Sequence, residues 1–335
     1  MNTQDGKESA GKSAVETLFS LDIGKGRLLK DKIVIATRES LLALWQAEYV
    51  KKRIEDTYPE IQVELLPMTT KGDQILDRSL LEIGGKGLFI KELEKLLLEK
   101  KADIAVHSLK DMTAVIPDGL KLAAVTARED PRDAFVSLEY GSLQELPEGA
   151  VVGTSSLRRQ AQLLHLRPDL QIKTLRGNVQ TRLRHLDEGN YDAVILAAAG
   201  LKRLGLRERI RSYISTCDSI PAAGQGVMAI ETRTGDDETM EIIQFIHDEK
   251  VASCIMAERA FLGKVGGDCK VPAGIYAVPF LGHIEAVAFI GSPDGKEMYK
   301  RSLNGQTQDA KQLGESLAEA LIADGGGRIL EELRK

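Results

Sequence analysis

The chain of 335 residues has few cysteines and few aromatic residues. Its three cysteines, Cys217, Cys254 and Cys269, form neither a CxxC pair nor an even set, which argues against a disulfide framework and a cysteine-rich zinc site. The five histidines show no spacing typical of metal ligands, so the sequence predicts no metal site. No apolar run is long enough to span a bilayer. With 43% hydrophobic and 28% charged residues, the composition is typical of a soluble globular protein.

The first 30 residues lack the features of a targeting segment. They mix acidic and basic residues and contain no apolar core of the kind found in a signal peptide. They are also too acidic for a typical transit peptide. We therefore interpret residues 1–30 as a disordered or weakly helical leader without an assigned function, and we expect a cytoplasmic protein that does not bind a membrane.

The length of the chain and its alternation of strands and helices indicate several α/β units. A chain of 335 residues exceeds what one hydrophobic core usually supports, so two or three domains are expected. Strand candidates at 32–37 and 150–154 are each followed by a polar turn and an amphipathic helix, as in a βα unit. A strand at 227–232 could return to the first sheet, which would give two lobes joined by two crossovers. Alternating runs between 273 and 303 suggest a small antiparallel sheet in a third, α+β domain.

One short stretch delivers several polar groups where a buried strand ends. Residues 103–106 read as an apolar strand, and His107, Ser108, Lys110 and Asp111 follow it directly. In α/β folds the carboxyl ends of strands are where ligands and chemistry lie. A salt-bridged turn explains the same residues equally well, so this stretch alone does not decide between a site and a turn.

Arginine is concentrated in the middle of the chain. Residues 151–211 hold ten Arg and two Lys against five Asp or Glu, an excess of positive charge of 12 − 5 = 7. Arginine favours planar, bidentate recognition of carboxylate or phosphate. A nucleic-acid surface is the alternative, but the segment is nearly free of aromatic side chains for base stacking, and the sequence pI is about 5.7.

The arginines recur at one topological position, immediately after predicted strands. The strand at 150–154 is followed by a pair of serines and a pair of arginines at a helix start, where backbone N–H groups favour anions. Two further strands, at 172–175 and 192–197, are also followed by Arg. Each could be a solvated face, but repetition at the same position favours a lined cleft. The residues concerned are Ser155, Ser156, Arg158, Arg159, Arg176 and Arg203.

Seven motifs occur in the order in which one known family carries them. They are Ala36-Thr-Arg-Glu-Ser40, Gly84-Gly-Lys-Gly-Leu-Phe89, His107-Ser-Leu-Lys-Asp111, Gly153-Thr-Ser-Ser-Leu-Arg-Arg159, Leu175-Arg-Gly-Asn178, Gly224-Gln-Gly226 and Gly267-Asp-Cys269-Lys-Val-Pro272. From about residue 32 to residue 335, the sequence resembles hydroxymethylbilane synthase, also called porphobilinogen deaminase. The resemblance implies a transferase of tetrapyrrole biosynthesis that joins four porphobilinogen molecules into linear hydroxymethylbilane with release of ammonia.

The resemblance also implies the fold and the partners. It implies an α/β protein with two hinged lobes resembling periplasmic binding proteins and a smaller C-terminal α+β domain. We expect domain 1 at 31–128 with 227–245, domain 2 at 129–226, and domain 3 at 246–335. The expected partners are porphobilinogen and the growing oligopyrrole, without nucleic acid, and we expect a monomer.

Residue roles are carried over from the family's motifs. Cys269 is the implied thioether attachment point of a dipyrromethane cofactor, although a cysteine in a Gly-rich loop is, without the family, more often a small buried hydrophobe. Asp111 is the implied catalytic carboxylate. The remaining cofactor-binding positions are Lys110, Ser156, Arg158, Arg159, Arg176 and Gly177. The implied substrate-binding positions are Arg38, Ser40, Thr154, Ser155, Arg182, Arg203 and Gln225.

Two residues depart from the family pattern, and one other reading of the chain stays open. Thr113 stands where a proline is common, so the turn after Asp111 could be less rigid. Asp268 stands where a glycine is frequent, and its charge could raise the pKa of the neighbouring thiol. A non-catalytic, two-lobed anion-binding protein would explain the arginines but would leave Cys269 and Asp111 without a role.

Overall fold

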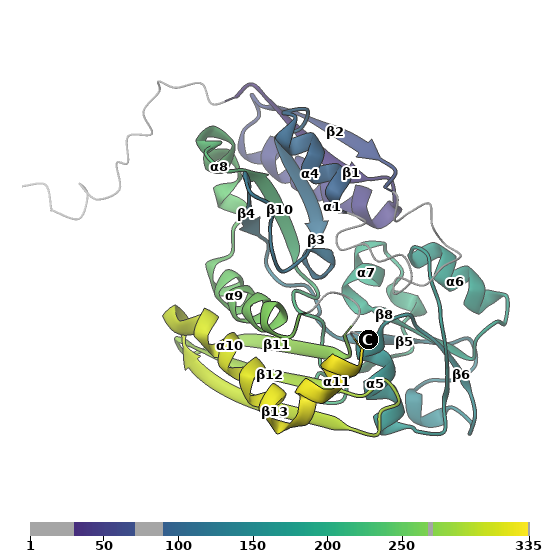
Figure 1. The fold of residues 1–335 in the computed structure, drawn as a ribbon. Coiled ribbons are helices and arrows are strands. Elements are labelled where there is room, and N and C mark those ends of the chain that lie inside the picture. The colour runs from purple at the N-terminus through teal and green to yellow at the C-terminus, as the bar shows by residue number, and fades with distance from the viewer. Residues whose placement is uncertain (1–29, 71–89, 267–270, 334–335) are drawn as a thin grey trace, which may run out of the picture.

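The structure, a computed structural model, describes residues 30–70, 90–266 and 271–333 (Figure 1). Three of the sequence-based predictions fall outside these ranges. They are the leader, the glycine-rich motif at 84–89, and the cofactor position Cys269 with its neighbour Asp268.

The first lobe is built on a five-stranded sheet with the strand order β2-β1-β3-β10-β4. β1 runs parallel to β2 and β3, whereas β10 is antiparallel to β3 and β4. β10 therefore returns to this sheet from far along the chain, as the sequence suggested. The strands are β1 (Lys32–Arg38), β2 (Gln62–Met68), β3 (Ile104–Ser108), β4 (Leu120–Val125) and β10 (Met228–Arg233).

Helices cover both faces of the first sheet. α1 (Leu41–Thr57) and α8 (Asp237–Ile243) pack on one face, and α4 (Lys91–Leu98) packs on the other. α1 begins where it does because the Ser40 hydroxyl accepts a hydrogen bond from the Ala43 amide at 3.4 Å. Its buried stripe ends at Ile54, which has no exposed surface, so truncating that side chain to alanine should cost about 2–5 kcal/mol.

The second lobe repeats this layered arrangement. Its sheet has the order β7-β6-β8-β5-β9, with β6 parallel to β7 and β8 and with β5 antiparallel to both of its neighbours. α5 packs on one face, and α6 and α7 pack on the other. The strands are β5 (Asp133–Val136), β6 (Val151–Gly153), β7 (Gln171–Lys173), β8 (Ala193–Ala197) and β9 (Ser212–Ile214). The helices are α5 (Leu157–Leu166), α6 (Val179–Asp187) and α7 (Ala198–Arg203).

Two chain crossovers join the lobes, at 126–132 and at 215–227. They lie against each other, and the Glu129 amide donates to the Gly226 carbonyl at 3.0 Å. Gly226 has a φ of 90°, and a Cβ built there would lie 2.3 Å from the Glu129 carbonyl oxygen. The paired crossovers thus require glycine at this position, both for the backbone conformation and for the close approach.

The C-terminal unit is a three-stranded antiparallel sheet with helices packed on one face. A Cβ at Gly314 would lie 2.0 Å from the Ala257 carbonyl oxygen, so glycine lets the two long helices meet closely. The other face of the sheet contacts the second lobe, where Phe289 packs against Ala161 of α5. The elements are α9 (Glu249–Lys264), β11 (Ala273–Phe280), β12 (His283–Gly291), β13 (Met298–Gln306), α10 (Ala310–Leu321) and α11 (Gly327–Glu332).

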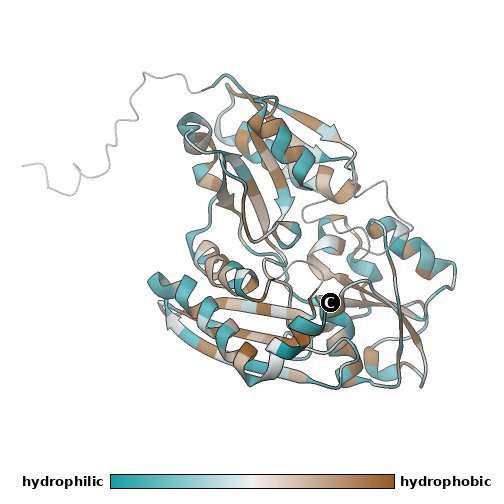
Figure 2. Ribbon diagram, viewed as in Figure 1, coloured by the Kyte–Doolittle hydropathy of each residue, from teal (hydrophilic) through white to brown (hydrophobic). Residues whose placement is uncertain are grey.

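The expected fold class is confirmed: two α/β lobes are followed by a smaller unit of sheet and helices. Apolar residues are concentrated along the central strands and on the inward faces of the helices (Figure 2). The domain boundaries given above stay predictions. Two strands of the second sheet, β5 and β9, were not predicted from the sequence. β5 has only four residues, all buried, and so shows no alternation of apolar and polar residues.

Candidate functional site

A cavity of about 600 Å³ lies between the two lobes and the C-terminal unit. Its walls come from the ends of β1, β3 and β8, from the starts of α5 and α6, and from the second crossover and β11. The lining includes thirteen of the residues that the sequence placed in the site: Arg38, Ser40, Lys110, Asp111, Ser155, Ser156, Arg158, Arg159, Arg176, Gly177, Arg182, Arg203 and Gln225. Thr154 is buried and is absent from the described lining.

Asp111 lies on the turn Leu109–Asp111 that follows β3, and its side chain is exposed. Within the described part of the chain, its carboxylate has no hydrogen bond or ion pair. The neighbouring Lys110 is half-buried, and burial lowers the pKa of its ammonium to about 8, although the charge of Asp111 opposes this shift. The cavity therefore holds a carboxylate that is available to a ligand, beside an amine that titrates close to neutral pH.

The backbone that carries Asp111 is fixed from several directions. The Leu109 amide donates to the Val227 carbonyl of the second crossover at 3.0 Å. Just before this turn, the His107 ring lies 3.1 Å from the carboxylate of Glu231 on β10, and both groups are buried. After the turn, the Thr113 hydroxyl donates to the Val115 carbonyl at 2.6 Å, and Arg259 donates to the Thr113 carbonyl at 3.1 Å. Hydrogen bonds thus hold the turn that lacks the family's proline.

The serines at the start of α5 complete the local backbone structure. The Ser156 hydroxyl accepts from the Arg159 amide at 3.4 Å, which makes Ser156 the N-cap of α5. Its own amide donates to the Thr154 hydroxyl at 3.2 Å. The Ser155 hydroxyl donates to the Leu175 carbonyl at 2.5 Å and so ties α5 to the segment before Arg176. Thr154 therefore does not line the cavity but holds the backbone of Ser156, which does.

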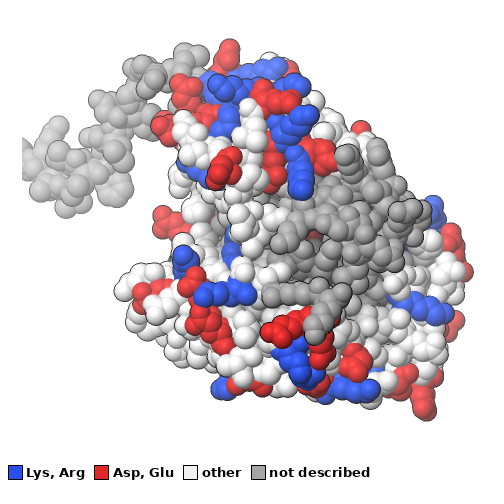
Figure 3. Space-filling view, in the orientation of Figure 1, with Lys and Arg blue, Asp and Glu red and all other residues white. Residues whose placement is uncertain are grey.

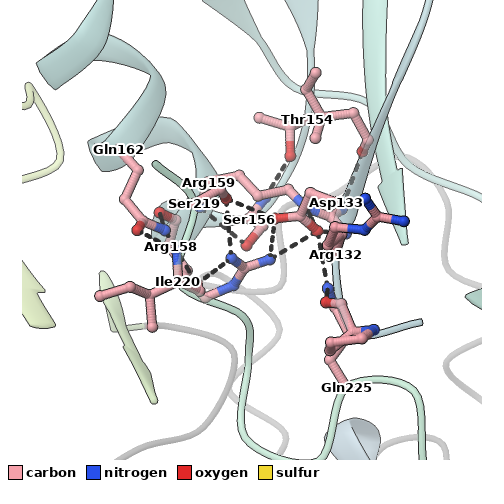
Figure 4. Close-up of polar contacts among 12 residues, drawn as sticks. Arg132, Asp133, Thr154, Ser156, Arg158, Arg159, Gln162, Ser219, Ile220 and Gln225 are labelled. Atoms are coloured by element: carbon pink, nitrogen blue, oxygen red, sulfur yellow. Dashed lines mark hydrogen bonds and ion pairs between the residues drawn. The ribbon is translucent and has the colours of Figure 1, made fainter. Parts of the chain in front are cut away.

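Arg158 and Arg159 share a partner that the sequence did not reveal, Asp133 at the start of β5 (Figure 4). The Asp133 carboxylate has no exposed surface and accepts from Arg158 at 2.8 Å and from Arg159 at 2.8 Å. Ser219 and Gln225 of the second crossover also donate to it, at 2.7 and 3.0 Å. Burial alone would raise the pKa of Asp133, but the two guanidinium groups outweigh burial and hold that pKa well below its usual range.

The remaining arginines reach the cavity from other elements. Arg182 on α6 donates to the Gly177 carbonyl at 2.8 Å, and Gly177 adopts a φ of 99° that favours glycine. Arg203 on α7 donates to the Gly226 carbonyl at 2.7 Å, and its guanidinium lies 6.0 Å from the ring of Trp45 in the first lobe. Burial lowers the pKa of both Arg182 and Arg203 to about 10. Both side chains are therefore charged at neutral pH.

The lining as a whole carries positive charge. Seven basic residues line the described walls against two acidic residues, Glu39 and Asp111, an excess of 7 − 2 = 5. The segment rich in arginine thus contributes to an internal site, and on the face shown in Figure 3 the basic and acidic side chains are intermingled. A group bearing several carboxylates fits this lining, because guanidinium forks match carboxylates in geometry and charge.

Fold and cavity together define a two-lobed α/β protein with a positively charged cavity between its lobes. Two family models match the chain: "Porphobilinogen deaminase, dipyromethane cofactor binding domain" over residues 33–241, and "Porphobilinogen deaminase, C-terminal domain" over residues 252–323. The chain belongs to the porphobilinogen deaminase family, whose members are transferases of tetrapyrrole synthesis that act on porphobilinogen. The first matched domain is the one that binds the dipyrromethane cofactor.

Solved structures of other proteins are also similar to the chain. A putative methionine-binding lipoprotein from Bacillus subtilis is 15% identical, with a TM-score of 0.41, and the match covers 66% of this chain and 92% of that protein. The VFT2 domain of BvgS from Bordetella pertussis is 16% identical, with a TM-score of 0.39, and the match covers 74% of this chain and 99% of that domain.

No helix in the described ranges is long and apolar enough to cross a membrane. No group of three or more His, Cys, Asp or Glu side chains in those ranges is arranged to hold a metal ion.

Proposed function

We propose that the chain is a hydroxymethylbilane synthase, which condenses four porphobilinogen molecules stepwise and releases one ammonia in each step. The observation that carries the proposal is the position of Asp111: an exposed carboxylate without a hydrogen-bond partner in the described chain, facing a cavity lined by arginines. This arrangement suits a substrate that bears carboxylates and passes through a cationic state.

In each step a C–N bond and a C–H bond break, and one C–C bond forms. The substrate's aminomethyl carbon loses its nitrogen as ammonia, which leaves positive charge spread over the pyrrole ring. That carbon then bonds to the free α-carbon of the terminal pyrrole, whose hydrogen leaves as a proton. We assign to Asp111 the stabilisation of the cationic ring and the acceptance of this proton, because a carboxylate placed beside the ring supplies both negative charge and a base.

The basic residues hold the substituents of the substrate and of the growing chain. Porphobilinogen carries an acetate and a propionate group, so each added unit brings two carboxylates. We assign Arg38, Arg176, Arg182 and Arg203 to these carboxylates, with Lys110 beside Asp111, because these side chains reach the cavity from both lobes. Gly177 and Gln225 line the wall between them, and Ser40, Ser155, Ser156 and Thr154 shape its turns.

We assign the covalent attachment of the dipyrromethane to Cys269, which precedes β11, a strand that contributes Ala273 and Ile275 to the cavity lining. When bound, this group supplies the pyrrole α-carbon on which the first condensation takes place. Arg158, Arg159, Arg176 and Lys110 face the same cavity and would hold its carboxylates.

The test is an ammonia-release assay with purified protein and porphobilinogen, combined with the intact mass of the protein. We expect ammonia release, a mass above that of the bare chain by one dipyrromethane, and further mass increments of one porphobilinogen unit during turnover. A protein that binds porphobilinogen but releases no ammonia and carries no added mass would instead be the non-catalytic anion-binding protein.

A further inference from the structure

Asp133 occupies the place that a ligand carboxylate would take between two arginines. Its Oδ2 accepts from Arg158 Nη2 at 2.8 Å, and its Oδ1 accepts from Arg159 Nε at 3.0 Å and Nη2 at 2.8 Å (Figure 4). Both arginines line the cavity, whereas Asp133 lies behind them without exposed surface. The protein thus carries an internal anion that shares these arginines with any bound carboxylate.

The two guanidinium groups differ in how their nitrogens are hydrogen-bonded. Arg158 has both η nitrogens engaged: Nη1 donates to the Ile220 carbonyl at 2.6 Å, and Nη2 donates to both Asp133 oxygens. Arg159 has all three nitrogens engaged, but each makes one bond: Nη1 donates to the Ile195 carbonyl at 3.0 Å, and Nε and Nη2 both donate to Asp133 Oδ1. Each η nitrogen of Arg159 therefore keeps one N–H for a ligand, whereas each η nitrogen of Arg158 already lies near two acceptors, because Nη1 is also 3.4 Å from the Ser219 hydroxyl. Arg158 in addition connects α5 to the second crossover.

The cluster of Arg158, Arg159 and Asp133 has a small net charge. Two guanidinium groups and one carboxylate sum to 2 − 1 = +1. Without the carboxylate, the same two side chains would present +2 to the cavity. An added unit charge about 5 Å from a bound anion, in a medium with an effective dielectric constant of about 20, changes affinity by about two orders of magnitude at most, and screening by water and salt in the open cavity lowers this to about tenfold.

We propose that Asp133 is a positioning residue that fixes the guanidinium planes of Arg158 and Arg159 and weakens their hold on ligand carboxylates, so that an anionic product can leave. The inference rests on the proposed function for the identity of that product. A chain that gains two carboxylates with each unit would otherwise be held more tightly at every step. The Asp133 carboxylate limits how tightly Arg158 and Arg159 can bind the carboxylates of that chain.

The experiment compares Asp133→Asn, Arg158→Gln and the double variant, with inorganic phosphate as the anionic probe. Phosphate binding is measured by thermal shift and as inhibition of ammonia release. Asp133→Asn raises the charge of the cluster to +2 and should bind phosphate about tenfold more tightly, with a lower KM and a lower kcat for porphobilinogen. Arg158→Gln lowers the charge to zero and should bind phosphate about tenfold more weakly. The double variant restores +1 and should return close to wild-type affinity.

Asp192→Asn is the matched control. Asp192 is in the same lobe and accepts from the Val151 amide at 2.6 Å, but it is not on the described lining of the cavity. It should leave phosphate affinity unchanged. If Asp133→Asn does not fold, the double variant is compared with Arg158→Gln, and the double variant should bind phosphate more tightly.

Weaker phosphate binding and a raised KM in Asp133→Asn would overturn the proposal, because a purely structural carboxylate predicts that sign. Equal affinity in Arg158→Gln and the double variant would also overturn it. The failure of the proposed function looks different: the wild-type protein would then release no ammonia, while the phosphate shifts could still be measured.

Discussion

Arg128 and Glu258 form a buried ion pair in which Arg128 Nη2 lies 2.7 Å from Glu258 Oε1. Arg128 belongs to the first crossover and Glu258 to α9. The second oxygen, Oε2, accepts from the Gly224 amide of the second crossover at 2.6 Å, and Oε1 also accepts from the Ala277 amide of β11 at 2.9 Å. One carboxylate therefore connects both crossovers to the C-terminal unit.

We expect Glu258→Gln to lower the free energy of unfolding by about 3–5 kcal/mol. Glu258 is fully buried, and both of its oxygens accept backbone N–H groups, so an amide nitrogen in either position would face another donor. The measurement is urea unfolding. Glu319→Gln is the control, because the pair of Lys264 and Glu319 is exposed and should contribute less than about 1 kcal/mol. Equal stability of the two variants would contradict the prediction.

Asp111→Asn should lower the rate of ammonia release by about 10²–10⁴, because the amide keeps the shape of the side chain but removes its charge and its basicity. Asp111→Glu keeps the charge one methylene away and should retain slow turnover. The measurement is single-turnover ammonia release. Both variants should melt close to wild type, because the side chain is exposed and has no partner in the described chain. Near-normal turnover of Asp111→Asn would show that this charge is dispensable.

Cys269→Ser should give a folded protein without the pyrrole mass and without turnover, as read by intact mass spectrometry. Of the two cysteines that the structure describes, Cys254 is buried, and burial raises the pKa of its thiol to about 11, so it is a poor nucleophile at neutral pH. Cys217 is exposed, so Cys217→Ser is the control and should keep the added mass. Peptide mapping that places the adduct on Cys217 would refute the assignment.

The KM for porphobilinogen should rise above about pH 8 as Lys110 loses its proton, because its pKa is lowered to about 8 chiefly by burial. Lys110→Arg stays charged and should remove this rise. The two proteins share every other titrating group, so the comparison isolates the effect of Lys110. The measurement is the pH dependence of KM in both proteins. A rise of the same size in Lys110→Arg would assign it to another group.

The pH dependence of the free energy of unfolding gives an independent check on the lowered pKa of Lys110. A lysine whose folded pKa is depressed destabilises the fold fully below about pH 8, and this penalty falls as the pH rises from about 8 toward the ordinary value of 10.5. Wild type should therefore gain stability relative to Lys110→Met across that interval. A flat difference in the free energy of unfolding would contradict the lowered pKa.

Local patterns in the sequence were sufficient for much of the molecule. The serine pair after the strand at 150–154 was placed at a helix start, and Ser156 does cap α5. The helix expected after the strand at 32–37 is α1, which Ser40 caps. Asp111 and the arginines after β6 and β8 follow apolar strands directly, so their meeting at one edge of the lobes was predictable from strand order. These features depend on neighbours within a few residues.

Asp133 illustrates what sequence patterns do not contain. Its strand, β5, is only four residues long and fully buried, and its partners lie 25, 26, 86 and 92 positions away in the chain. No local spacing connects these side chains. The sequence therefore indicated ligand contacts for Arg158 and Arg159 and gave no sign that both are already bonded within the protein.

The sequence by itself determined most of the elements, the charge of the cleft and the family to which the chain belongs, because these depend on periodicity, composition and ordered motifs. Only the tertiary structure decided how the charges are paired. Asp133 and Glu258 are buried where several chain segments meet, and a buried carboxylate must be matched by donors whatever their distance in sequence. Long-range packing therefore decided which arginines remain open to a ligand and which connect the parts of the fold.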